Sequence, residues 1–365
     1  MGFKCGIVGL PNVGKSTLFN ALTETASAQA ANYPFCTIEP NVGDVAVPDP
    51  RLFQLAEIAE SKEIIPTRLS FVDIAGLVRG ASKGEGLGNQ FLATIREVDA
   101  IVHVLRCFED TDITHVEGSV DPLRDAEIIE IELMLSDLES LEKRLVGLEK
   151  KAKSGEKEAK FMVGLMRKAT DLLEDGKPAR IADISQEERK AWKELNLLTT
   201  KPILYVCNVE EDAASTGNEF SQKVSEKAKA ENAAVIVVSA AIEEEVAQLD
   251  KSERAEFLET LGLQEAGLDR LIRAGYDLLE LITYFTVGPK EARAWTVRTG
   301  TKAPKAAGTI HTDFEKGFIR AETIAFDEFI KHNGEAGCKD AGKMRLEGKE
   351  YVVADGDVMH FRFAN

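Results

Sequence analysis

The chain has 365 residues, 44% of them hydrophobic and 29% charged, which is ordinary for a globular protein but too long for one small core, so two or three domains are expected. Its formal net charge of -17 argues against a general nucleic-acid binder, because such proteins rely on cations that contact phosphate. The sequence shows no amino-terminal signal pattern and no apolar run long enough to span a bilayer, so we expect a cytoplasmic protein without a membrane partner.

The first predicted elements are a strand, a loop and a helix that carry a phosphate-binding pattern. Residues 9–17 read GLPNVGKST and match G-x-x-x-x-G-K-[ST]. Residues 3–8 are typical of a short buried strand and residues 16–22 of a helix, which is the context that the pattern requires. Backbone N–H groups could then wrap around phosphates, with Lys15 on the β and γ phosphates and Ser16 on Mg²⁺. The alternative is an ordinary strand–turn–helix connection.

The next segment, residues 30–41, is polar and contains prolines, which predicts a loop able to fold over the phosphates. In P-loop switch proteins one threonine of such a loop binds Mg²⁺ only when the γ-phosphate is present, and Thr37 is the candidate here. The alternative is that Thr37 only starts a strand at residues 42–47.

Five cysteines are scattered along the chain without C-x-x-C spacing: Cys5, Cys36, Cys107, Cys207 and Cys338. This pattern favours reduced thiols over a zinc site or a disulfide framework. Cys36 lies beside the predicted metal ligand Thr37, so a redox role is an alternative to burial as a small hydrophobic residue.

Residues 69–76 predict a second strand that ends in D-x-x-G. Asp73 would hold Mg²⁺ through water, and the Gly76 N–H would contact the γ-phosphate. Leu77 follows where Ras-like proteins carry the glutamine that orients the attacking water, so hydrolysis must use another group or be slow. The glycine-rich residues 80–92 predict a segment that moves, and together with D-x-x-G-L they resemble the Obg branch of the P-loop GTPases.

Two histidines follow in different surroundings. His103 lies in the apolar run 100–106, which predicts a buried strand and a core histidine with its hydrogen bonds satisfied. His115 lies in the polar, acidic residues 109–115, where a surface histidine without a role is the default interpretation.

From residue 121 the pattern becomes long helix. One set of apolar residues has coiled-coil spacing, namely Ile131, Leu135, Leu138, Leu141, Leu145 and Leu148, and a second set follows a break at 153–155, namely Phe161, Met162, Leu165, Met166, Leu172 and Leu173. Two antiparallel helices would form a projecting hairpin. Its tip, residues 142–160, has seven Lys or Arg against four Glu, net +3. These charges could contact RNA phosphates, or they could form an ordinary solvated helix face.

Residues 201–208 return to the buried-strand pattern, so the helices are an insertion in the nucleotide domain. This strand ends in N-V-E-E where GTPases have N-K-x-D, with Val209 in place of the lysine and Glu211 in place of the aspartate. That aspartate accepts hydrogen bonds from guanine, and altering it removes the advantage of guanine over adenine. A last buried strand, residues 233–239, leads to Ser239 and Ala240, which fit the loop that covers the base.

Beyond residue 275 short strands and polar turns predict a separate α+β module. Strands are expected at 282–287, 292–297, 318–324, 351–353 and 358–363, with a short helix at 304–311. We therefore predict four segments: a nucleotide-binding domain in two parts (1–125 and 199–278), an inserted helical hairpin (126–198) and a carboxyl-terminal domain (279–365).

These motifs together resemble the YchF group of Obg-like ATPases along nearly the whole chain. The resemblance rests on G-L-P-N-V-G-K-S-T, N-Y-P-F-C-T-I-E-P-N, D-I-A-G-L with its glycines, N-V-E-E, and HTDFEKGFIRAE at residues 311–322. It implies an α/β fold, with a Ras-like or Obg-type P-loop NTPase domain, an inserted antiparallel coiled coil and a carboxyl-terminal β-grasp (TGS) domain.

The resemblance also implies roles for particular residues. The phosphates would be bound by Asn12, Val13, Gly14, Lys15, Ser16 and Thr17, with Gly76, and Mg²⁺ by Ser16, Thr37 and Asp73. The base would be bound by Asn208, Val209, Glu211, Ser239 and Ala240, Val209 acting through its backbone. His115 fits the position of a mobile histidine that replaces the missing glutamine in hydrolysis.

As a function, the resemblance implies Mg²⁺-dependent hydrolysis of ATP in preference to GTP, and binding to the ribosome and its large subunit in translation or stress response. RNA would be contacted through Lys150, Lys151 and Lys153 or through the TGS domain. The alternative is a GTP- or dual-nucleotide-gated ribosome-binding module in which hydrolysis is incidental. Asn12 suggests a further hypothesis, since related potassium-dependent GTPases use an asparagine there to hold K⁺.

Overall fold

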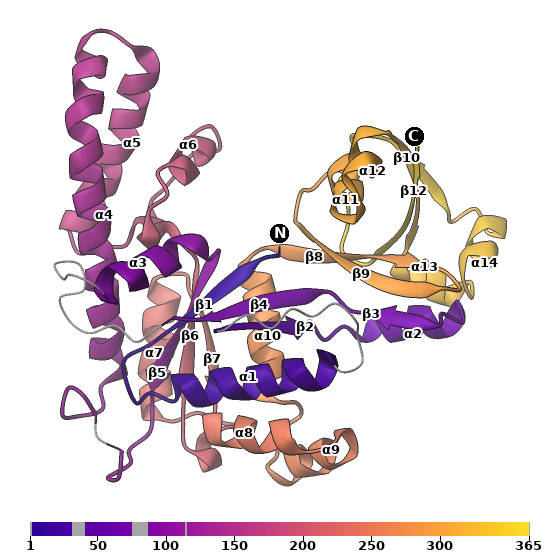
Figure 1. The fold of residues 1–365 in the computed structure, drawn as a ribbon, viewed down its shortest axis with the longest axis horizontal. Helices are drawn as coiled ribbons and strands as arrows, with labels where there is room; N and C mark the ends of the chain where they lie inside the picture. The colour runs from indigo at the N-terminus through magenta and orange to yellow at the C-terminus, as the bar shows by residue number, and fades with distance from the viewer. Residues whose placement is uncertain (1, 31–40, 75–86, 114, 365) are drawn as a thin grey trace. The chain divides into compact units, whose positions relative to one another are not determined.

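The computed structural model describes residues 2–30, 41–74, 87–113 and 115–364. Within them the chain forms two compact units, one from residues within Met1–Thr25, Thr37–Gly43 and Ser70–Ala274, the other from residues within Ala26–Cys36, Asp44–Leu69 and Gly275–Asn365. Two six-stranded sheets dominate the fold (Figure 1). Among the helices in these ranges, none is both long and apolar enough to cross a bilayer.

The first sheet has the strand order β2-β4-β1-β5-β6-β7. Its strands are β1 (Lys4–Val8), β2 (Val42–Ala46), β4 (Arg68–Asp73), β5 (Ala100–Arg106), β6 (Ile203–Asn208) and β7 (Ala234–Val238). All neighbouring pairs from β4 to β7 are parallel. β5 and β6 are buried along their whole length, as expected for apolar strands covered by helices on both faces. The carboxyl ends of β1, β4, β5 and β6 therefore meet at one edge.

The outer strand β2 runs in the opposite direction from β4. The Val47 N–H donates to the Thr67 carbonyl at 2.9 Å, and the Asp73 N–H donates to the Asn41 carbonyl at 2.8 Å. The helices of this unit are α1 (Lys15–Ala30), α3 (Leu87–Glu97), α7 (Glu219–Ala230), α8 (Ala240–Gln248), α9 (Lys251–Thr260) and α10 (Gly267–Leu278). This arrangement confirms the predicted α/β class, with the phosphate pattern between β1 and α1.

His103 is buried in β5 as predicted, but the expectation of satisfied hydrogen bonds is wrong for one ring nitrogen. Its side chain has no described hydrogen-bond partner at Nε2, and its ring lies 5.8 Å from that of Tyr205. Burial lowers the pKa of His103 to about 3, and the charges of Arg180 and Lys227 add to this effect. The strand therefore holds a neutral imidazole in an apolar setting.

The insertion forms two long helices, α4 (Pro122–Lys153) and α5 (Lys157–Glu174), seen as an antiparallel pair in Figure 1. α4 begins at the Asp121 cap, whose carboxylate accepts the Arg124 N–H at 3.2 Å, with Pro122 at the first helical position. Gly155 follows the end of α4 with φ +98°, a conformation that glycine adopts without steric cost. The chain returns through η1 (Ala179–Ile181), α6 (Arg189–Glu194) and η2 (Leu198–Thr200).

The predicted seam is correct for the outer half of this hairpin and wrong for its base. Leu141 is fully buried among residues of α5, whereas Ile131 and Leu135 are 49% and 39% exposed. Phe161, expected inside, is 47% exposed. A different side chain orients the base of α4: the buried Asp137 carboxylate accepts the N–H groups of Leu198 and Thr199, each at 2.8 Å. These two bonds, and not the leucine spacing, determine which face of α4 points inward at the base of the hairpin.

The second sheet has the order β11-β10-β12-β8-β9-β3. Its strands are β3 (Glu63–Ile65), β8 (Leu281–Val287), β9 (Glu291–Arg298), β10 (Phe318–Ala325), β11 (Arg345–Glu347) and β12 (Asp357–Phe363). Four of the five strands predicted in this region are confirmed. The fifth is wrong, because residues 351–353 contain only an isolated bridge between Lys302 and Val352.

Helices cover both faces of this second sheet. One core cluster holds Tyr284, Ala321 and Phe361 against α11 (Ala303–Ile310), near α12 (Thr312–Lys316). The other holds Phe285 and Val358 against α2 (Pro50–Ile58), α13 (Phe326–Lys331) and α14 (Glu335–Asp340). Residues 44–69, predicted within the nucleotide domain, thus supply α2 and β3 to the second unit. The four predicted domain segments stay a prediction.

Candidate functional site

The phosphate loop, residues 9–14, joins β1 to α1 at the carboxyl edge of the first sheet. Gly14 has φ +89°, and a Cβ atom on it would lie 2.2 Å from Asn208 Nδ2. A Cβ atom on Gly9 would lie 2.8 Å from the Val104 carbonyl oxygen of β5. Both glycines of the pattern are therefore required by close contacts inside the first unit.

Within and just after this loop, the side chains that we predict to bind phosphate differ in exposure. Asn12, with φ +63°, and Ser16 are exposed, Val13 is buried, and Lys15 and Thr17 are half-buried. The Leu18 N–H donates to the Gly14 carbonyl at 3.0 Å, which closes the first turn of α1. Earlier N–H groups of a helix lack partners within it, so this end can bind an anion.

Two predicted ligands of the phosphate and the metal lie in direct contact. The Lys15 ammonium forms an ion pair with Asp73, and only 10% and 20% of the two side chains are exposed. The contact arises because β4 lies beside β1, with Asp73 in register with Ile7. A lysine and a carboxylate thus meet beside the ends of two adjacent strands, and Ser16 follows Lys15 in the first turn of α1.

Oxygen donors of this kind fit Mg²⁺, which prefers carboxylate, hydroxyl and phosphate oxygens and keeps several waters. The ranges that the structure describes contain no cluster of three His, Cys, Asp or Glu side chains that could hold a metal. Thr37 and Gly76, predicted to take part, lie outside the described residues, as do Leu77 and Cys36.

Asn208 at the end of β6 connects the phosphate loop with the predicted base loop. Its Nδ2 donates to the Val13 carbonyl at 2.9 Å, and its Oδ1 accepts the Ala240 N–H at 2.9 Å. Both bonds are buried. Asn208 thus joins two segments that are far apart in sequence.

The other predicted base-binding residues surround this link. Val209 is buried, and its N–H donates to the Val238 carbonyl at 2.9 Å, so a backbone contact from Val209 to a base would have to use its carbonyl oxygen. Ser239 is buried at the start of α8. Glu211 is exposed at the first position of η3 (Glu211–Ala213).

His115 is buried, so its interpretation as a surface histidine is wrong; only 7% of the residue is exposed. Its Nε2 lies 2.8 Å from Asp125 Oδ2, and its Nδ1 accepts the Glu117 N–H at 3.1 Å. Since Nδ1 accepts, the ring proton is assigned to Nε2, which donates to Asp125. Both ring nitrogens are therefore occupied by this chain.

Asp125 is a residue that the sequence did not single out. It lies in the first turn of α4, is 1% exposed, and contacts Arg124 Nη2 at 3.4 Å as well as His115. Burial raises the pKa of Asp125, while the bonds from His115 and Arg124 oppose that rise. An acidic residue at a helix start is usually explained by the helix dipole, so the pattern gave no sign of a partner ten residues earlier.

Arg106 organises the loop that carries His115. This fully buried guanidinium donates to the carbonyl groups of Phe108, Asp110 and Ile113 at 2.9 to 3.2 Å. Its charge lies 4.6 Å from the centre of the Phe108 ring. The loop after β5 is therefore anchored at both ends, by Arg106 and by the His115–Asp125 bond.

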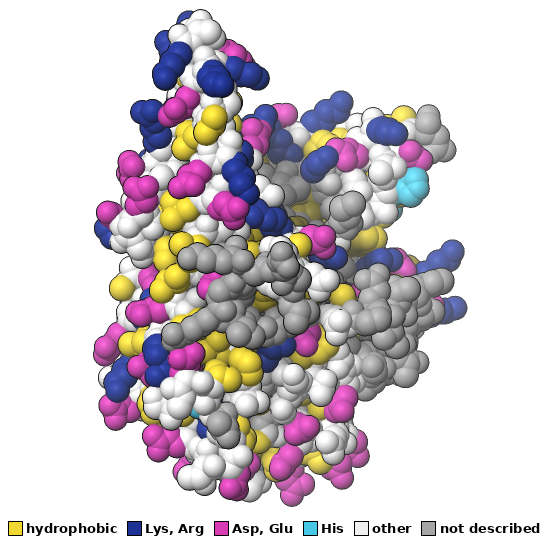
Figure 2. All heavy atoms as spheres, turned by 60° about the vertical axis from the view of Figure 1, so that its left-hand side comes forward, with side chains coloured by type: hydrophobic (Ala, Val, Ile, Leu, Met, Phe, Trp, Pro, Cys, Tyr) yellow, Lys and Arg dark blue, Asp and Glu magenta, His cyan; other side chains and the backbone are white. Residues whose placement is uncertain are grey.

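The predicted RNA contact at the hairpin tip consists of exposed cations. Lys150, Lys151 and Lys153 lie in the last turn of α4, and Lys157 begins α5. Figure 2 shows Lys and Arg side chains gathered at this tip. Within the described chain, none of Lys150, Lys151 and Lys153 forms an ion pair. The tip thus presents positive charge on an acidic protein.

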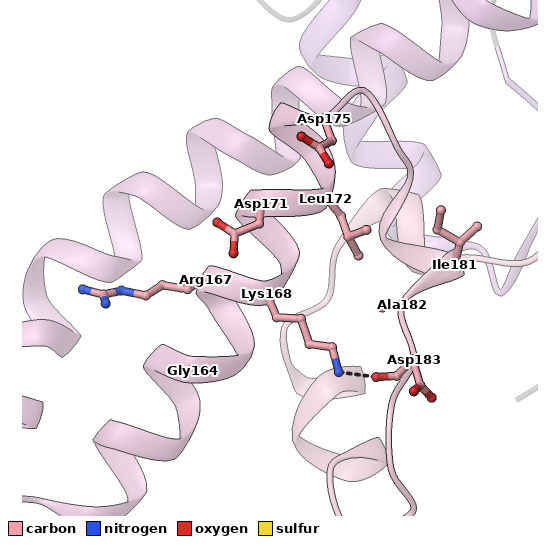
Figure 3. Close-up of a pocket in the computed structure, with 9 residues that line it drawn as sticks. All are labelled: Gly164, Arg167, Lys168, Asp171, Leu172, Asp175, Ile181, Ala182 and Asp183. Atoms are coloured by element: carbon pink, nitrogen blue, oxygen red, sulfur yellow. Dashed lines mark hydrogen bonds between the residues drawn. The ribbon is translucent and has the colours of Figure 1, made fainter.

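A hollow of ≈ 530 Å³ lies along α5, apart from the phosphate loop (Figure 3). Its walls carry charges of both signs, including Arg167, Lys168 and Asp171, and the Lys168 ammonium donates to the Asp183 carbonyl. The mixture of signs gives no preference for one ligand class.

Two known family profiles match parts of this chain. Residues 4–135 match the family profile described as "50S ribosome-binding GTPase", and residues 281–364 match YchF-GTPase_C, described as a protein of unknown function. The first profile spans the phosphate loop and the start of α4, and the second spans most of the second sheet.

Full-length relatives were also found. The "Ribosome-binding ATPase YchF" of Haemophilus influenzae is 61% identical over 363 residues, covering 100% of this chain and 99% of the relative. The protein of the same name from Bacillus subtilis is 58% identical over 365 residues, covering 100% of both chains. The solved structure of the Schizosaccharomyces pombe YchF GTPase matches with a TM-score of 0.89 and 41% identity, covering 99% of this chain and 98% of that one. This chain therefore belongs to the YchF family of P-loop nucleotide-binding proteins.

Proposed function

We propose that this protein is a Mg²⁺-dependent nucleoside triphosphatase that prefers ATP to GTP, and that its bound nucleotide controls attachment to the ribosome. The observation that carries the proposal is the buried Asn208 link between the phosphate loop and the base loop, beside the Lys15–Asp73 pair. Relatives named as ribosome-binding ATPases support the choice of reaction and partner.

Phosphate binding would use the backbone at the start of α1 and the Lys15 ammonium. The loop is already bent into shape by Gly9 and Gly14, so little conformational entropy is lost when phosphates bind. Lys15 would turn from Asp73 towards the β and γ phosphates. Asp73 would then be free to bind a metal-bound water, with the Ser16 hydroxyl and Thr37 as the other protein ligands. Mg²⁺ bound there would neutralise charge that develops on the phosphate oxygens.

Base recognition would use the edge formed by Asn208, Val209, Glu211, Ser239 and Ala240. The N-V-E-E sequence lacks the lysine and the aspartate that serve guanine, which removes the usual preference for that base. Since the Val209 N–H is bonded within the sheet, its carbonyl oxygen is the backbone group that could accept from the amino group of adenine.

His115 would take the part of the missing glutamine in hydrolysis. A histidine that orients or deprotonates water needs one ring nitrogen free as an acceptor. Here Nε2 is bound to Asp125 and Nδ1 accepts from Glu117, so one bond must break before His115 can act. Nucleotide-dependent movement of the anchored loop would supply that step, and it would couple hydrolysis to the first turn of α4.

Ribosome attachment would use cations on this acidic chain, either at the hairpin tip or in the carboxyl-terminal module. Arg and Lys contacts with RNA phosphate give affinity that falls steeply with salt. The exposed Lys150, Lys151 and Lys153 suit such contacts. Asn12, exposed in the phosphate loop, is proposed to help hold K⁺; equal turnover in potassium and sodium buffers would contradict that part.

The test is ATP turnover by the purified full chain. We expect Mg²⁺-dependent release of phosphate that falls by roughly 100-fold or more in Lys15→Ala, because phosphate transfer depends mainly on electrostatic stabilisation. Lys223→Ala, which removes an exposed lysine of the same unit paired with Glu219, is the matched control and should keep its turnover. Turnover that survives Lys15→Ala, or that is equal with EDTA, would overturn the proposed reaction.

A further inference from the structure

Asn218, the half-buried residue before α7, has a partner for every polar group of its side chain. Its Oδ1 accepts the Ser221 N–H at 3.0 Å, which caps the helix, and the Asn218 N–H donates to Ser221 Oγ at 2.8 Å. Its Nδ2 donates to the Cys107 carbonyl at 2.6 Å and lies 3.0 and 3.1 Å from the two carboxylate oxygens of Glu210. Because an amide group carries two N–H donors, both donors are used.

Helix capping alone does not explain the amide of Asn218. An aspartate or a serine would cap the helix as well, because the cap needs only an acceptor. The bonds from Nδ2 need a donor, and a carboxylate in its place would face the Cys107 carbonyl and the Glu210 carboxylate, both of which are acceptors. The amide therefore has a second task, which is to hold two segments together.

These two segments follow the neighbouring strands β5 and β6. Cys107 is the first residue after β5, and its N–H donates to the Asn208 carbonyl at 2.8 Å. Glu210 lies two residues beyond the end of β6. Asn218 thus connects the segment that we propose to bind the base with the start of the loop that carries His115.

The Val209 carbonyl lies between two anchored residues. On one side the Val209 N–H donates to the Val238 carbonyl at 2.9 Å, and on the other side Asn218 holds the Glu210 side chain. This carbonyl oxygen is the backbone group that we propose to accept from the amino group of adenine. Its direction depends on the peptide plane between Val209 and Glu210, so an anchor on Glu210 restricts that direction before the base binds.

We propose that Asn218 is a positioning residue for base recognition, whose amide holds Glu210 beside the Cys107 carbonyl and so fixes the direction of the Val209 carbonyl. Guanine carries a carbonyl oxygen where adenine carries its amino group. A fixed carbonyl on the protein therefore rejects guanine, and a carbonyl that can turn away rejects it less. This inference rests on the adenine preference in the proposed function and adds to it a residue outside the N-V-E-E sequence.

The experiment measures binding of ATP and of GTP to the full chain by calorimetry with Mg²⁺, together with KM and kcat for ATP and thermal melting. We compare wild type with Asn218→Asp, which keeps the cap acceptor and removes both donors. Glu210→Gln can still accept from Nδ2, and Asn218→Asp/Glu210→Gln restores one bond with donor and acceptor exchanged. The matched control is Ser221→Ala, which removes the second bond of the helix cap and leaves Nδ2 untouched.

In Asn218→Asp the ratio of ATP affinity to GTP affinity should fall by about 10-fold, the usual effect of one lost hydrogen bond to a charged group. The KM for ATP should rise while kcat changes by less than about 2-fold, because Arg106 holds the His115 loop independently. Glu210→Gln and Ser221→Ala should keep the wild-type ratio, and the double variant should recover most of the loss. Asn218→Ser, which also caps a helix without the two donors, should repeat the fall if the aspartate variant does not fold.

An unchanged ratio in a folded Asn218 variant would overturn the positioning role alone, as would a double variant without recovery. A changed ratio in Glu210→Gln would mean that this carboxylate contacts the base itself, and would overturn the assignment through the backbone. A fall in kcat at an unchanged ratio would assign Asn218 to the His115 loop and overturn its part in base recognition. A wild-type chain that binds ATP no more tightly than GTP would overturn the adenine preference in the proposed function, and this inference with it.

Discussion

The phosphate loop and the helical hairpin belong to the same unit, yet their sequences determine their structures in different ways. In the phosphate loop, close contacts leave no choice of residue: a side chain at Gly14 would collide with the Asn208 side chain, and one at Gly9 would collide with the Val104 carbonyl. In the hairpin, apolar spacing gives the helices, but Asp137 decides which face of α4 turns inward at its base. A motif whose residues are required by close contacts therefore predicts local structure more securely than apolar periodicity predicts the buried face of one long helix.

Substitutions along α4 test this comparison with the largest expected effect. Leu141→Ala should lower the free energy of unfolding by ~2–5 kcal/mol, because Leu141 is fully buried against α5. Leu135→Ala, the same change on the exposed side, should cost less than about 1 kcal/mol. Urea unfolding of both variants measures the difference. Equal costs would mean that the predicted seam, and not the Asp137 contact, orients the helix.

Substitutions at His115 and Asp125 distinguish a catalytic role of His115 from a structural role of the His115–Asp125 hydrogen bond. His115→Ala should reduce ATP turnover by about 100-fold with ATP affinity retained, the usual size of a lost general acid or base. Asp125→Asn should keep nucleotide binding and change turnover through the altered position of the ring, with a shifted pH profile. Single-turnover assays from pH 5 to 9 give both results.

Unchanged turnover in His115→Ala would remove the catalytic role, and the His115–Asp125 bond would then be only structural. Glu117→Ala is a suitable control for general disturbance of this loop, because the Glu117 contribution to His115 comes from its backbone N–H.

The buried His103 in β5 should make the stability of the first unit depend on pH. Its pKa in the folded state is about 3 against an ordinary 6.5, so below pH 6.5 the unfolded chain takes up a proton that the folded chain does not. Stability is therefore complete above that pH and is lost as the pH falls towards 3. The loss between pH 7 and pH 5 should be about 2 kcal/mol. Unfolding of His103→Leu should show a shallower pH dependence, and an identical slope would contradict the buried neutral ring.

The hairpin tip should give the smallest effect on the enzyme. Changing Lys150, Lys151 and Lys153 to Gln should leave ATP turnover unchanged and weaken binding to ribosomes several-fold at low salt, because exposed cations act through screened contacts. Co-sedimentation with ribosomes measures it, and Lys223→Gln is the control. Unchanged binding would move the RNA contact to the carboxyl-terminal module.

The features that can be predicted from the sequence are mostly those set by local spacing. The strand, loop and helix around Lys15 and most strands of the second sheet were predictable, because each rests on local spacing. Asp125 and Arg106 were not, because their contacts within the loop after β5 and the first turn of α4 leave no periodic pattern, and the α2–β3 segment was not, because β3 pairs with the distant strand β9. His115 shows the difference well: its loop composition suggested the surface, and a partner on α4 buries it.

The edge around Lys15 and Asn208 should bind adenine nucleotides, and titration calorimetry with ATP and GTP side by side measures this binding. With Mg²⁺ present, we expect one site per chain, tighter binding of ATP than of GTP, and loss of that difference in Asn208→Ala, which breaks the link to Val13 and Ala240. Tighter binding of GTP, or no binding of either nucleotide, would contradict it.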